Sequence, residues 1–403
     1  MKNVVIIGAG HGAGQVVASL RQKKFTGHIT LIGEEPWYPY QRPPLSKKFL
    51  AGELPAERLY FKPESFYDEP NIEVHLATRV TSIDRDRKCV TTADGRSFDY
   101  DYAVIATGSR PRKLSLPGAE LPGIHYLRDI SDVDGIRNDM ETGRRMTIIG
   151  AGYIGLEVAA VAARLGLQVT VVEMEDRVMS RVVSPELSDF YQGVHKENGV
   201  NLKLSTGITG FSGDGHVDGV NLDSEVTLPT DIVVIGIGIV PNIELAADCG
   251  LDVSNGILVD DHCRTSDTSI FSIGDCTWHP NALLGYELRL ESVHNALEQA
   301  KTAAGNICGE DLAYAQVPWF WSDQYDLKLQ IAGMSQGYDQ VVIRGSLEDR
   351  SFACLYLRDR ELIAVDAVNA PKDFVQSKPL IAAHAKIDPN ILGDANIPLK
   401  DMV

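Results

Sequence analysis

The feature that most constrains this chain is a glycine-rich pattern that occurs twice, with its two copies 142 residues apart. Residues 3–14 read NVVIIGAGHGAG, and residues 145–155 read RMTIIGAGYIG. Each copy is a short apolar run typical of a buried strand, followed by a glycine turn and a helical stretch. The separation is too long for a solenoid repeat. The pattern therefore predicts two copies of a nucleotide-binding unit within one chain.

The positions of this motif have separate tasks. The first glycine permits a tight turn, the second lets the backbone approach a pyrophosphate, and the third position lets the helix pack close to the strand. The helix N-terminus then offers free N–H groups and the positive end of its dipole to the phosphates. The candidate phosphate-binding residues of the two copies are Gly8, Gly10, Gly12, Ala13, Gly150, Gly152, Ile154 and Gly155.

An acidic residue follows the second expected strand of each unit, at the distance typical of a ribose-binding carboxylate. Glu34 lies 24 residues after Gly10, and Glu173 lies 21 residues after Gly152. A carboxylate in the second unit repels a 2′-phosphate, and positions 174 and 175 hold Met and Glu rather than Arg. NAD is therefore expected in preference to NADP. The role of Arg177, four residues after Glu173, is left open between phosphate contact and solvated charge.

Strands alternate with helices through most of the chain, which implies parallel, doubly wound sheets. Helices are expected at 15–21, 156–165 and 291–305, and strands at 28–32, 168–172 and 269–275. From about Val317 the segments become aromatic and strand-like. We expect an α/β protein with two Rossmann-like dinucleotide-binding domains and a C-terminal α+β domain. The expected boundaries are 1–110 and 243–316 for the discontinuous first domain, 111–242 for the second, and 317–403 for the third.

The composition excludes several function classes. A net charge of −17 argues against nonspecific nucleic-acid binding, which needs a basic surface. No apolar run reaches the roughly 18 residues of a membrane helix, and no signal peptide precedes the first glycine loop. We therefore expect a cytoplasmic protein. No two of the six cysteines lie within four residues of each other, so neither a zinc site nor a cysteine-ligated cluster is expected, and no metal is assigned.

Ordered motifs along the whole chain resemble one family. They are YPYQRPPLSK (38–47), ATG (106–108), GAGYIGLEVAA (150–160), GIGIVPN (236–242), SIGDC (272–276), ESVHNALEQA (291–300) and VPWFWSDQY (317–325). The chain is similar to the oxygenase-coupled NADH–ferredoxin reductases of the FAD-dependent pyridine nucleotide-disulfide oxidoreductase superfamily. The resemblance implies two glutathione-reductase-type nucleotide domains, a noncovalent FAD in the first domain and NAD in the second.

The resemblance also carries residue roles onto matching positions. Gly12 would line the FAD pyrophosphate, Glu34 would bind the adenine ribose, and Val80 would touch the adenine through its backbone. The remaining cofactor-binding positions implied by the family motifs are Arg42, Lys47, Ala106, Thr107, Gly108, Arg128, Gly238, Asp275 and Val293. One departure is Gln41, which stands where many relatives carry an acid.

Three residues are the catalytic candidates. Lys47 is expected near the flavin, with Glu157 as its ion-pair partner that also orients the nicotinamide amide, on the family's pattern. Trp321 is the aromatic residue that the resemblance places over the flavin, whereas interdomain packing remains the alternative reading for both Trp319 and Trp321. Flavin disulfide reductases need a redox-active thiol, and the segment 38–48 contains no cysteine. Electrons should therefore leave directly from the flavin.

The expected function is an NADH-dependent ferredoxin reductase. FAD would take a hydride from NADH and pass single electrons to a 2Fe-2S ferredoxin that serves a cytochrome P450 or a ring-hydroxylating dioxygenase. Two alternatives remain: a flavin reductase for rubredoxin or monodehydroascorbate, and a redox sensor like apoptosis-inducing factor. An acidic ferredoxin needs a basic patch on its partner, and the candidates for that patch are Arg289, Lys301, Lys372 and Lys378.

Overall fold

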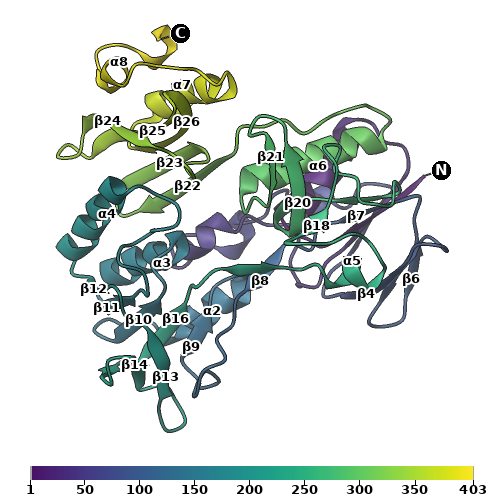
Figure 1. The fold of residues 1–403 in the computed structure, drawn as a ribbon. Coiled ribbons are helices and arrows are strands. Elements are labelled where there is room, and N and C mark those ends of the chain that lie inside the picture. Colours follow the sequence, from purple (N-terminus) through teal and green to yellow (C-terminus); the bar gives the residue numbers. More distant parts are fainter. Residues whose placement is uncertain (1, 403) are drawn as a thin grey trace. The chain divides into compact units, whose positions relative to one another are not determined.

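The computed structural model describes residues 2–402, and the chain divides into two compact units. Unit 1 contains the residues up to Arg42, Glu57–Arg110 and Val240–Pro318. Unit 2 contains Pro43–Ala56, Pro111–Ile239 and the residues from Trp319 onward. The chain therefore passes from one unit to the other several times, and each unit is built from segments that lie far apart in sequence (Figure 1).

Unit 1 is centred on a five-stranded parallel sheet with the order β19-β7-β1-β2-β3. Its strands are β1 (Asn3–Ile7), β2 (His28–Ile32), β3 (Ile72–His75), β7 (Tyr102–Ile105) and β19 (Ile270–Ser272). The central strands are rich in Val and Ile and are buried, as expected for a sheet covered on both faces.

Helices α1 (His11–Gln22) and α6 (Val293–Ile307) cover one face of this sheet. Alternate residues of β1 divide between the faces: Val4 and Ile6 pack with the helices, whereas Val5 and Ile7 join the opposite core. That opposite core also receives residues of the antiparallel meander β4 (Val80–Asp84), β5 (Cys89–Thr92) and β6 (Ser97–Asp99), and of α5 (Glu244–Asp248). A small sheet completes the unit: β18 (Ile257–Leu258), β20 (Thr277–Asn281) and β21 (Tyr286–Leu288).

Unit 2 repeats the architecture with a second five-stranded parallel sheet, in the order β12-β11-β10-β16-β9. Its strands are β9 (Ile124–Tyr126), β10 (Arg145–Ile149), β11 (Gln168–Val172), β12 (Asn201–Lys203) and β16 (Ile232–Ile235). The associated helices are α2 (Ile130–Asp139), α3 (Tyr153–Arg164) and α4 (Pro185–Glu197). An antiparallel meander belongs to the same unit: β13 (Ile208–Ser212), β14 (Gly219–Leu222) and β15 (Thr227–Pro229). Two short strands, β8 (Ser109–Pro111) and β17 (Ile239–Pro241), lie where the chain changes units.

The C-terminal part of unit 2 forms an antiparallel sheet with the order β22-β23-β26-β25-β24. Its strands are β22 (Trp319–Gln324), β23 (Leu327–Gly333), β24 (Gln340–Ser346), β25 (Ser351–Arg358) and β26 (Glu361–Val368). Helix α7 (Pro371–Ala382) packs on β26 and β23, and α8 (Pro389–Gly393) packs on β24 (Figure 1). The α/β fold class expected from the sequence is confirmed.

The expected elements agree with the observed ones to within a few residues. Strands β2 and β11 have the expected bounds, whereas α1 begins at His11 instead of residue 15. Helix α6 begins at Val293 because the Ser292 side chain accepts a hydrogen bond from the Asn295 N–H and caps the helix. Within residues 2–402, no helix is both long and apolar enough to cross a membrane.

Candidate functional site

The two glycine fingerprints fold into the same local structure, one in each unit. Strand β1 runs into Gly8, and β10 runs into Gly150. In both units the N–H of this glycine donates to the last residue of the neighbouring strand, Ile32 or Val172, at 2.8 Å. Glycine is required at both positions because their φ angles are +114° and +103°. A Cβ on Gly8 would lie 2.3 Å from the Ala106 carbonyl oxygen, and one on Gly150 would lie 2.5 Å from that of Gly236.

The second glycine of each fingerprint faces open space instead. Gly10 and Gly152 are the N-cap residues of α1 and α3, and neither helix has a side chain that caps its first turn. Apart from the adjoining backbone, no heavy atom of residues 2–402 lies within 4 Å of a Cβ placed on either glycine. Each unit therefore has a cradle of backbone N–H groups and space beside it, which fits the pyrophosphate of a dinucleotide.

The third position of each fingerprint closes the contact between helix and strand. Ala13 is fully buried in the core of unit 1. In the second copy, a Cβ on Gly155 would lie 2.2 Å from the Gly150 carbonyl oxygen, so only glycine fits. Gly12 is buried against Ile273, whereas Ile154 of the second copy is exposed at the start of α3.

The two ribose-binding candidates have different surroundings. The carboxylate of Glu34 is exposed and lies 3.6 Å from Arg79. Glu173 is half-buried, and its carboxylate accepts hydrogen bonds from the N–H groups of Ala151 at 2.6 Å and Glu175 at 3.0 Å. These two bonds hold the Glu173 carboxylate beside the second cradle.

Arg177 is engaged within its own loop. Its guanidinium donates to the carbonyl oxygens of Val183 at 2.9 Å and Ser180 at 2.7 Å. The side chain is therefore occupied in holding the backbone that follows Glu173, and these bonds favour a structural role over contact with a 2′-phosphate.

Polar residues also line the junctions around the first cradle. The Ser109 hydroxyl donates to Asp275 at 2.8 Å, which fixes that carboxylate in the turn after β19. Thr107 and Asn242 bond each other twice: the Thr107 hydroxyl donates to the Asn242 carbonyl at 2.8 Å, and the Asn242 amide donates to the Thr107 carbonyl at 2.9 Å. Asn242 belongs to a motif visible in the sequence, but only the fold reveals this pairing.

Two amides of α6, Asn295 and Gln299, are fully buried in unit 1. The Oδ1 atom of Asn295 and the Nε2 atom of Gln299 are buried, and neither has a hydrogen-bond partner within residues 2–402. The other end of Gln299 accepts the N–H of Gly274 at 2.7 Å. Both residues are 0% exposed, so protein atoms cover them and they do not face the open cradle. The fit of FAD to unit 1 rests instead on the open face of Gly10 and the uncapped N-terminus of α1.

In the loop after β2, an acidic residue of the same loop holds the Arg42 side chain. Arg42 forms an ion pair with Glu35 at 2.5 Å and donates to the Tyr40 hydroxyl at 2.9 Å. Glu35 is a partner that the sequence patterns did not single out, because the pairing depends on how the loop folds back.

The remaining cofactor candidates lie at element ends. Val80 begins β4, Val293 begins α6, and Arg128 precedes α2, with its N–H bonded to Asp132 at 2.8 Å. Gly238 is exposed, with φ at +103° and open space around it. Ala106 and Gly108 follow β7 beside Thr107. The roles of these residues remain proposals.

Unit 2 brings the catalytic candidates Lys47 and Glu157 together. The Lys47 ammonium donates to Glu157 Oε2 at 2.7 Å and to the Pro43 carbonyl at 3.1 Å. The Glu157 side chain is only 4% exposed, so the ion pair is largely shielded from water. Two hydroxyls complete its surroundings: Ser46 donates to Oε2, and Ser322 donates to Oε1 at 2.7 Å. Both serines lie within the motif segments 38–47 and 317–325, but the residue pattern does not predict their contact with Glu157.

The tryptophans of β22 form an aromatic cluster within unit 2. The ring centroids of Trp319 and Trp321 lie 5.5 Å apart, and those of Trp319 and Phe374 lie 5.7 Å apart. The ammonium of Lys378 lies 5.5 Å from the Trp319 ring. Trp319 therefore contacts both Trp321 and Phe374 within unit 2. Trp321 is half-buried and lies at one end of this row of three rings.

The four basic docking candidates differ in how much surface they present. Lys372 is exposed, and the half-exposed Lys301 pairs with Glu298 at 2.5 Å. The Arg289 side chain is only 13% exposed and pairs with Glu291, so it offers little surface to a partner. Lys378 is engaged with the aromatic cluster of unit 2.

The cysteines are described best by their burial. All six are free thiols, and burial raises the pKa of five of them: Cys249, Cys263, Cys276, Cys308 and Cys354. A raised pKa keeps a thiol protonated and poorly nucleophilic, which is the opposite of what a redox-active cysteine needs. None of these five thiols therefore has the lowered pKa that a redox-active cysteine needs; direct electron exit from the flavin stays a prediction.

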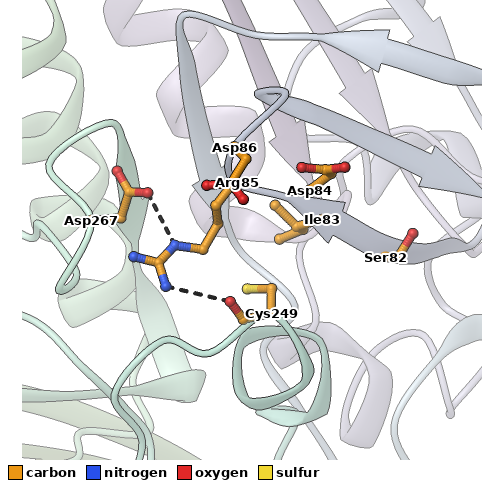
Figure 2. A pocket seen from close by; sticks show the side chains of 7 residues that line it. All are labelled: Ser82, Ile83, Asp84, Arg85, Asp86, Cys249 and Asp267. Atoms are coloured by element: carbon orange, nitrogen blue, oxygen red, sulfur yellow. Dashed lines mark hydrogen bonds and ion pairs between the residues drawn. The ribbon is translucent and has the colours of Figure 1, made fainter.

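A polar pocket lies in unit 1 at the C-terminal end of β4 (Figure 2). Arg85 bonds Asp267 at 3.1 Å and the Gly250 carbonyl at 2.9 Å, while the protonated thiol of Cys249 donates to a backbone carbonyl. Asp84 and Asp86 add further negative charge to the wall. A dinucleotide phosphate would be repelled there.

The comparisons with known proteins cover the whole chain. The family model for the pyridine nucleotide-disulphide oxidoreductases matches residues 2–300, and the model for the reductase C-terminal domain matches residues 319–403. Putidaredoxin reductase of Pseudomonas putida is 42% identical over 407 aligned residues, which cover 100% of this chain and 96% of that protein. Rhodocoxin reductase of Rhodococcus erythropolis is 43% identical and covers 99% of this chain and 93% of its own length. The solved covalent complex of putidaredoxin reductase with putidaredoxin matches with a TM-score of 0.96 and 42% identity, covering 99% of this chain and 97% of that one.

Proposed function

The chain belongs to the pyridine nucleotide-disulphide oxidoreductase family, and on this premise we propose that it is an NADH-dependent ferredoxin reductase that carries FAD. The observation that carries the proposal is the presence of two complete dinucleotide cradles in one chain. Each has a strand, a glycine turn, a helix whose N-terminus no side chain caps, and an acidic residue after the next strand. One dinucleotide can remain bound while the other exchanges as substrate.

FAD is assigned to unit 1. Gly8, Gly10 and Gly12 would hold its pyrophosphate, Glu34 its adenine ribose, and Asp275 its ribityl chain. The open face of Gly10, the uncapped N-terminus of α1 and the Asp275 carboxylate held by Ser109 support this assignment. When bound, the flavin supplies the ability to accept a hydride from NADH and to release electrons singly to a one-electron carrier.

NAD is assigned to unit 2, where Gly150, Gly152 and Gly155 form the cradle. The Glu173 carboxylate can accept both ribose hydroxyls and repels a 2′-phosphate. Two backbone N–H groups fix that carboxylate, and Arg177 is already bonded to carbonyl oxygens. These contacts support NADH as the preferred coenzyme.

Lys47 and Glu157 are the proposed catalytic pair. Hydride transfer needs correct distance and orientation more than a strong acid or base. The ion pair is shielded and both carboxylate oxygens accept hydrogen bonds, so its geometry is rigid. It can therefore hold fixed charges near the reacting rings and a carboxylate acceptor for the nicotinamide amide. Trp321 is proposed as the aromatic residue at the electron exit.

The electron acceptor is proposed to be a 2Fe-2S ferredoxin of an oxygenase system. The solved neighbour is a complex of putidaredoxin reductase with putidaredoxin, and the chain is similar to that reductase over its full length. Because this chain carries a net charge of −17, an acidic ferredoxin must meet a local basic surface, and exposed Lys372 and Lys301 are proposed for it. The reaction is placed in the cytoplasm, where NADH is available and thiols stay reduced.

In this assignment the FAD-binding domain comprises residues 1–110 and 243–316, the NAD-binding domain comprises 111–242, and the C-terminal domain comprises 317–403. The first two domains would each contribute one cradle, and the third would contribute β22 with its serine and tryptophans.

The test is an anaerobic NADH titration of the purified protein, followed by visible absorbance, with and without a 2Fe-2S ferredoxin. Rapid bleaching of the flavin, together with cytochrome c reduction that depends on added ferredoxin, is the expected result. A reduced flavin that forms a long-lived charge-transfer band and turns over slowly with the ferredoxin would favour a redox sensor. Fast turnover with rubredoxin but not with a ferredoxin would instead identify a rubredoxin reductase.

A further inference from the structure

A line of buried polar side chains leads away from the Lys47–Glu157 ion pair within unit 2. Ser322 and Gln324 lie two residues apart on β22, so both side chains point to the same face of the sheet. Their exposures are 0% and 1%, and α3, which carries Glu157, packs against this strand. The buried face of an edge strand here carries a hydroxyl and an amide where apolar residues are usual.

Four hydrogen bonds connect this line without a gap. Ser322 lies 2.7 Å from Glu157 Oε1, and Gln324 Nε2 lies 3.2 Å from the Ser322 hydroxyl. Gln324 Oε1 lies 2.8 Å from Nε2 of His195, a residue of α4 that is 0% exposed. The Tyr325 hydroxyl then lies 3.0 Å from His195 Nδ1. The series therefore begins in a turn of the C-terminal sheet and ends at the carboxylate.

The chemistry of these groups fixes the direction of every bond. A carboxylate only accepts, so Ser322 must donate its single hydroxyl proton to Glu157 and must accept from the Gln324 amide. The oxygen of Gln324 then requires an N–H on Nε2 of His195. A neutral imidazole has one N–H, so Nδ1 accepts the proton of the Tyr325 hydroxyl. Burial lowers the pKa of His195, which keeps the ring neutral.

The start of the line is held in an unusual backbone conformation. Tyr325 has φ at +56°, a left-handed geometry that is uncommon and strained for a bulky residue. Its ring packs edge-on against His195, with centroids 5.1 Å apart. A Gly or Asn would fit this hairpin turn without strain, so the position of the Tyr325 hydroxyl is a candidate reason for a tyrosine here.

We propose that Tyr325, His195, Gln324 and Ser322 form a directional hydrogen-bond chain that positions the Glu157 carboxylate for the hydride-transfer step. The chain holds Oε1 with Ser322 and thereby leaves Oε2 to Lys47 and Ser46. All four are positioning residues because they act through Glu157. The inference rests on the proposed reductase function and extends it to residues that are not among the site residues expected from the sequence.

The kinetic test is anaerobic stopped-flow reduction of the bound flavin by NADH. Ser322→Ala is expected to slow reduction about tenfold, which corresponds to about 1.4 kcal/mol of transition-state stabilisation. The matched control is Ser377→Ala, at another fully buried serine of the C-terminal part, whose hydroxyl donates to a backbone carbonyl in α7. The control variant is expected to stay within about twofold of the parent protein.

A double-mutant cycle separates positioning from general damage. If Ser322 acts through Glu157, then Ser322→Ala causes no further slowing in a Glu157→Gln background. An undiminished tenfold effect in that background, or a wild-type rate for Ser322→Ala alone, overturns the proposal.

A second readout does not depend on turnover. Ring ¹⁵N chemical shifts of His195 should report a neutral Nε2–H tautomer, and Tyr325→Phe should change the Nδ1 shift because its donor is removed. An Nδ1–H tautomer in the parent protein reverses the first link and overturns the directional chain. A parent protein that NADH does not reduce would refute the proposed function, and the His195 tautomer would still decide whether the chain exists.

Discussion

Substituting the second glycine of each fingerprint by alanine should empty one nucleotide site at a time. Gly152 has φ −77° and ψ −178°, and Gly10 has φ −88° and ψ −168°, both of which alanine adopts freely. Apart from the adjoining backbone, no described heavy atom lies within 4 Å of the added methyl group at either position. Alanine is a poorer N-cap than glycine, which lowers the free energy of unfolding. Alanine also restricts the unfolded chain more than glycine does, which raises the free energy of unfolding. Because the two effects oppose each other, the free energy of unfolding of the nucleotide-free protein should change by no more than about 1 kcal/mol.

The same methyl group occupies the space through which a pyrophosphate approaches the backbone. Losing one hydrogen bond to a charged phosphate costs about 1.5–3 kcal/mol, or about tenfold to a hundredfold in affinity. Gly152→Ala should therefore raise KM for NADH by that factor while FAD content stays at the parent level. Gly10→Ala should lower FAD content and leave the second cradle intact.

The assay combines FAD absorbance per polypeptide, the steady-state KM for NADH, and thermal unfolding. Gly150→Ala serves as the contrasting variant, because φ of +103° and a Cβ 2.5 Å from the Gly236 oxygen should destabilise unit 2 itself. An unchanged KM for NADH in Gly152→Ala, or loss of FAD from that variant, would refute the assignment of the two cradles.

Four further predictions test separate parts of the account. Glu173→Ser should raise kcat/KM with NADPH relative to NADH by about tenfold or more; an unchanged ratio would remove Glu173 from coenzyme selection. Lys47→Met should lower the free energy of unfolding in chemical denaturation by about 3 kcal/mol, because the Glu157 carboxylate, 4% exposed, loses its cation. Adding Glu157→Gln should recover most of that loss. Equal stabilities of the single and double variants would contradict this. Burial raises the pKa of Asp366 to about 7, so the folded protein holds this proton more tightly than the unfolded chain does. The free energy of unfolding of the parent, relative to that of Asp366→Asn, should therefore fall as pH rises from 5 to 8. A pH-independent difference would show that Asp366 does not titrate in this range. Lys301→Glu should raise the KM for ferredoxin about threefold to tenfold at low salt; an unaltered KM and salt dependence would exclude Lys301 from the docking surface.

The parts of the fold that the sequence predicted well are those fixed by local chemistry. The strand 28–32 ends just before Gly33, the strand 168–172 ends just before Glu173, and both have the expected bounds. The predicted start of α1, residue 15, is four residues too late. Its N-cap is Gly10, which carries no capping side chain that a sequence pattern could detect.

The surroundings of Glu157 could not be predicted in this way. Ser46 is 111 residues away along the chain and Ser322 is 165 residues away, so only tertiary packing brings their hydroxyls to the carboxylate. The same holds for Tyr325, whose left-handed backbone contradicts the local preference of a tyrosine. Family resemblance suggested Lys47 as the partner of Glu157, and the structure brings the two side chains together.

The central claim is that one polypeptide binds FAD and NADH together and uses the flavin, without a redox-active thiol, as its store of electrons. The most direct test is the number of NADH equivalents that fully reduce the purified, yellow protein under anaerobic conditions. The account predicts about one NADH per FAD, because one flavin accepts two electrons. Reduction that requires about two equivalents would reveal a second two-electron centre such as a disulfide, and a colourless protein that cannot be reconstituted with FAD would contradict the account altogether.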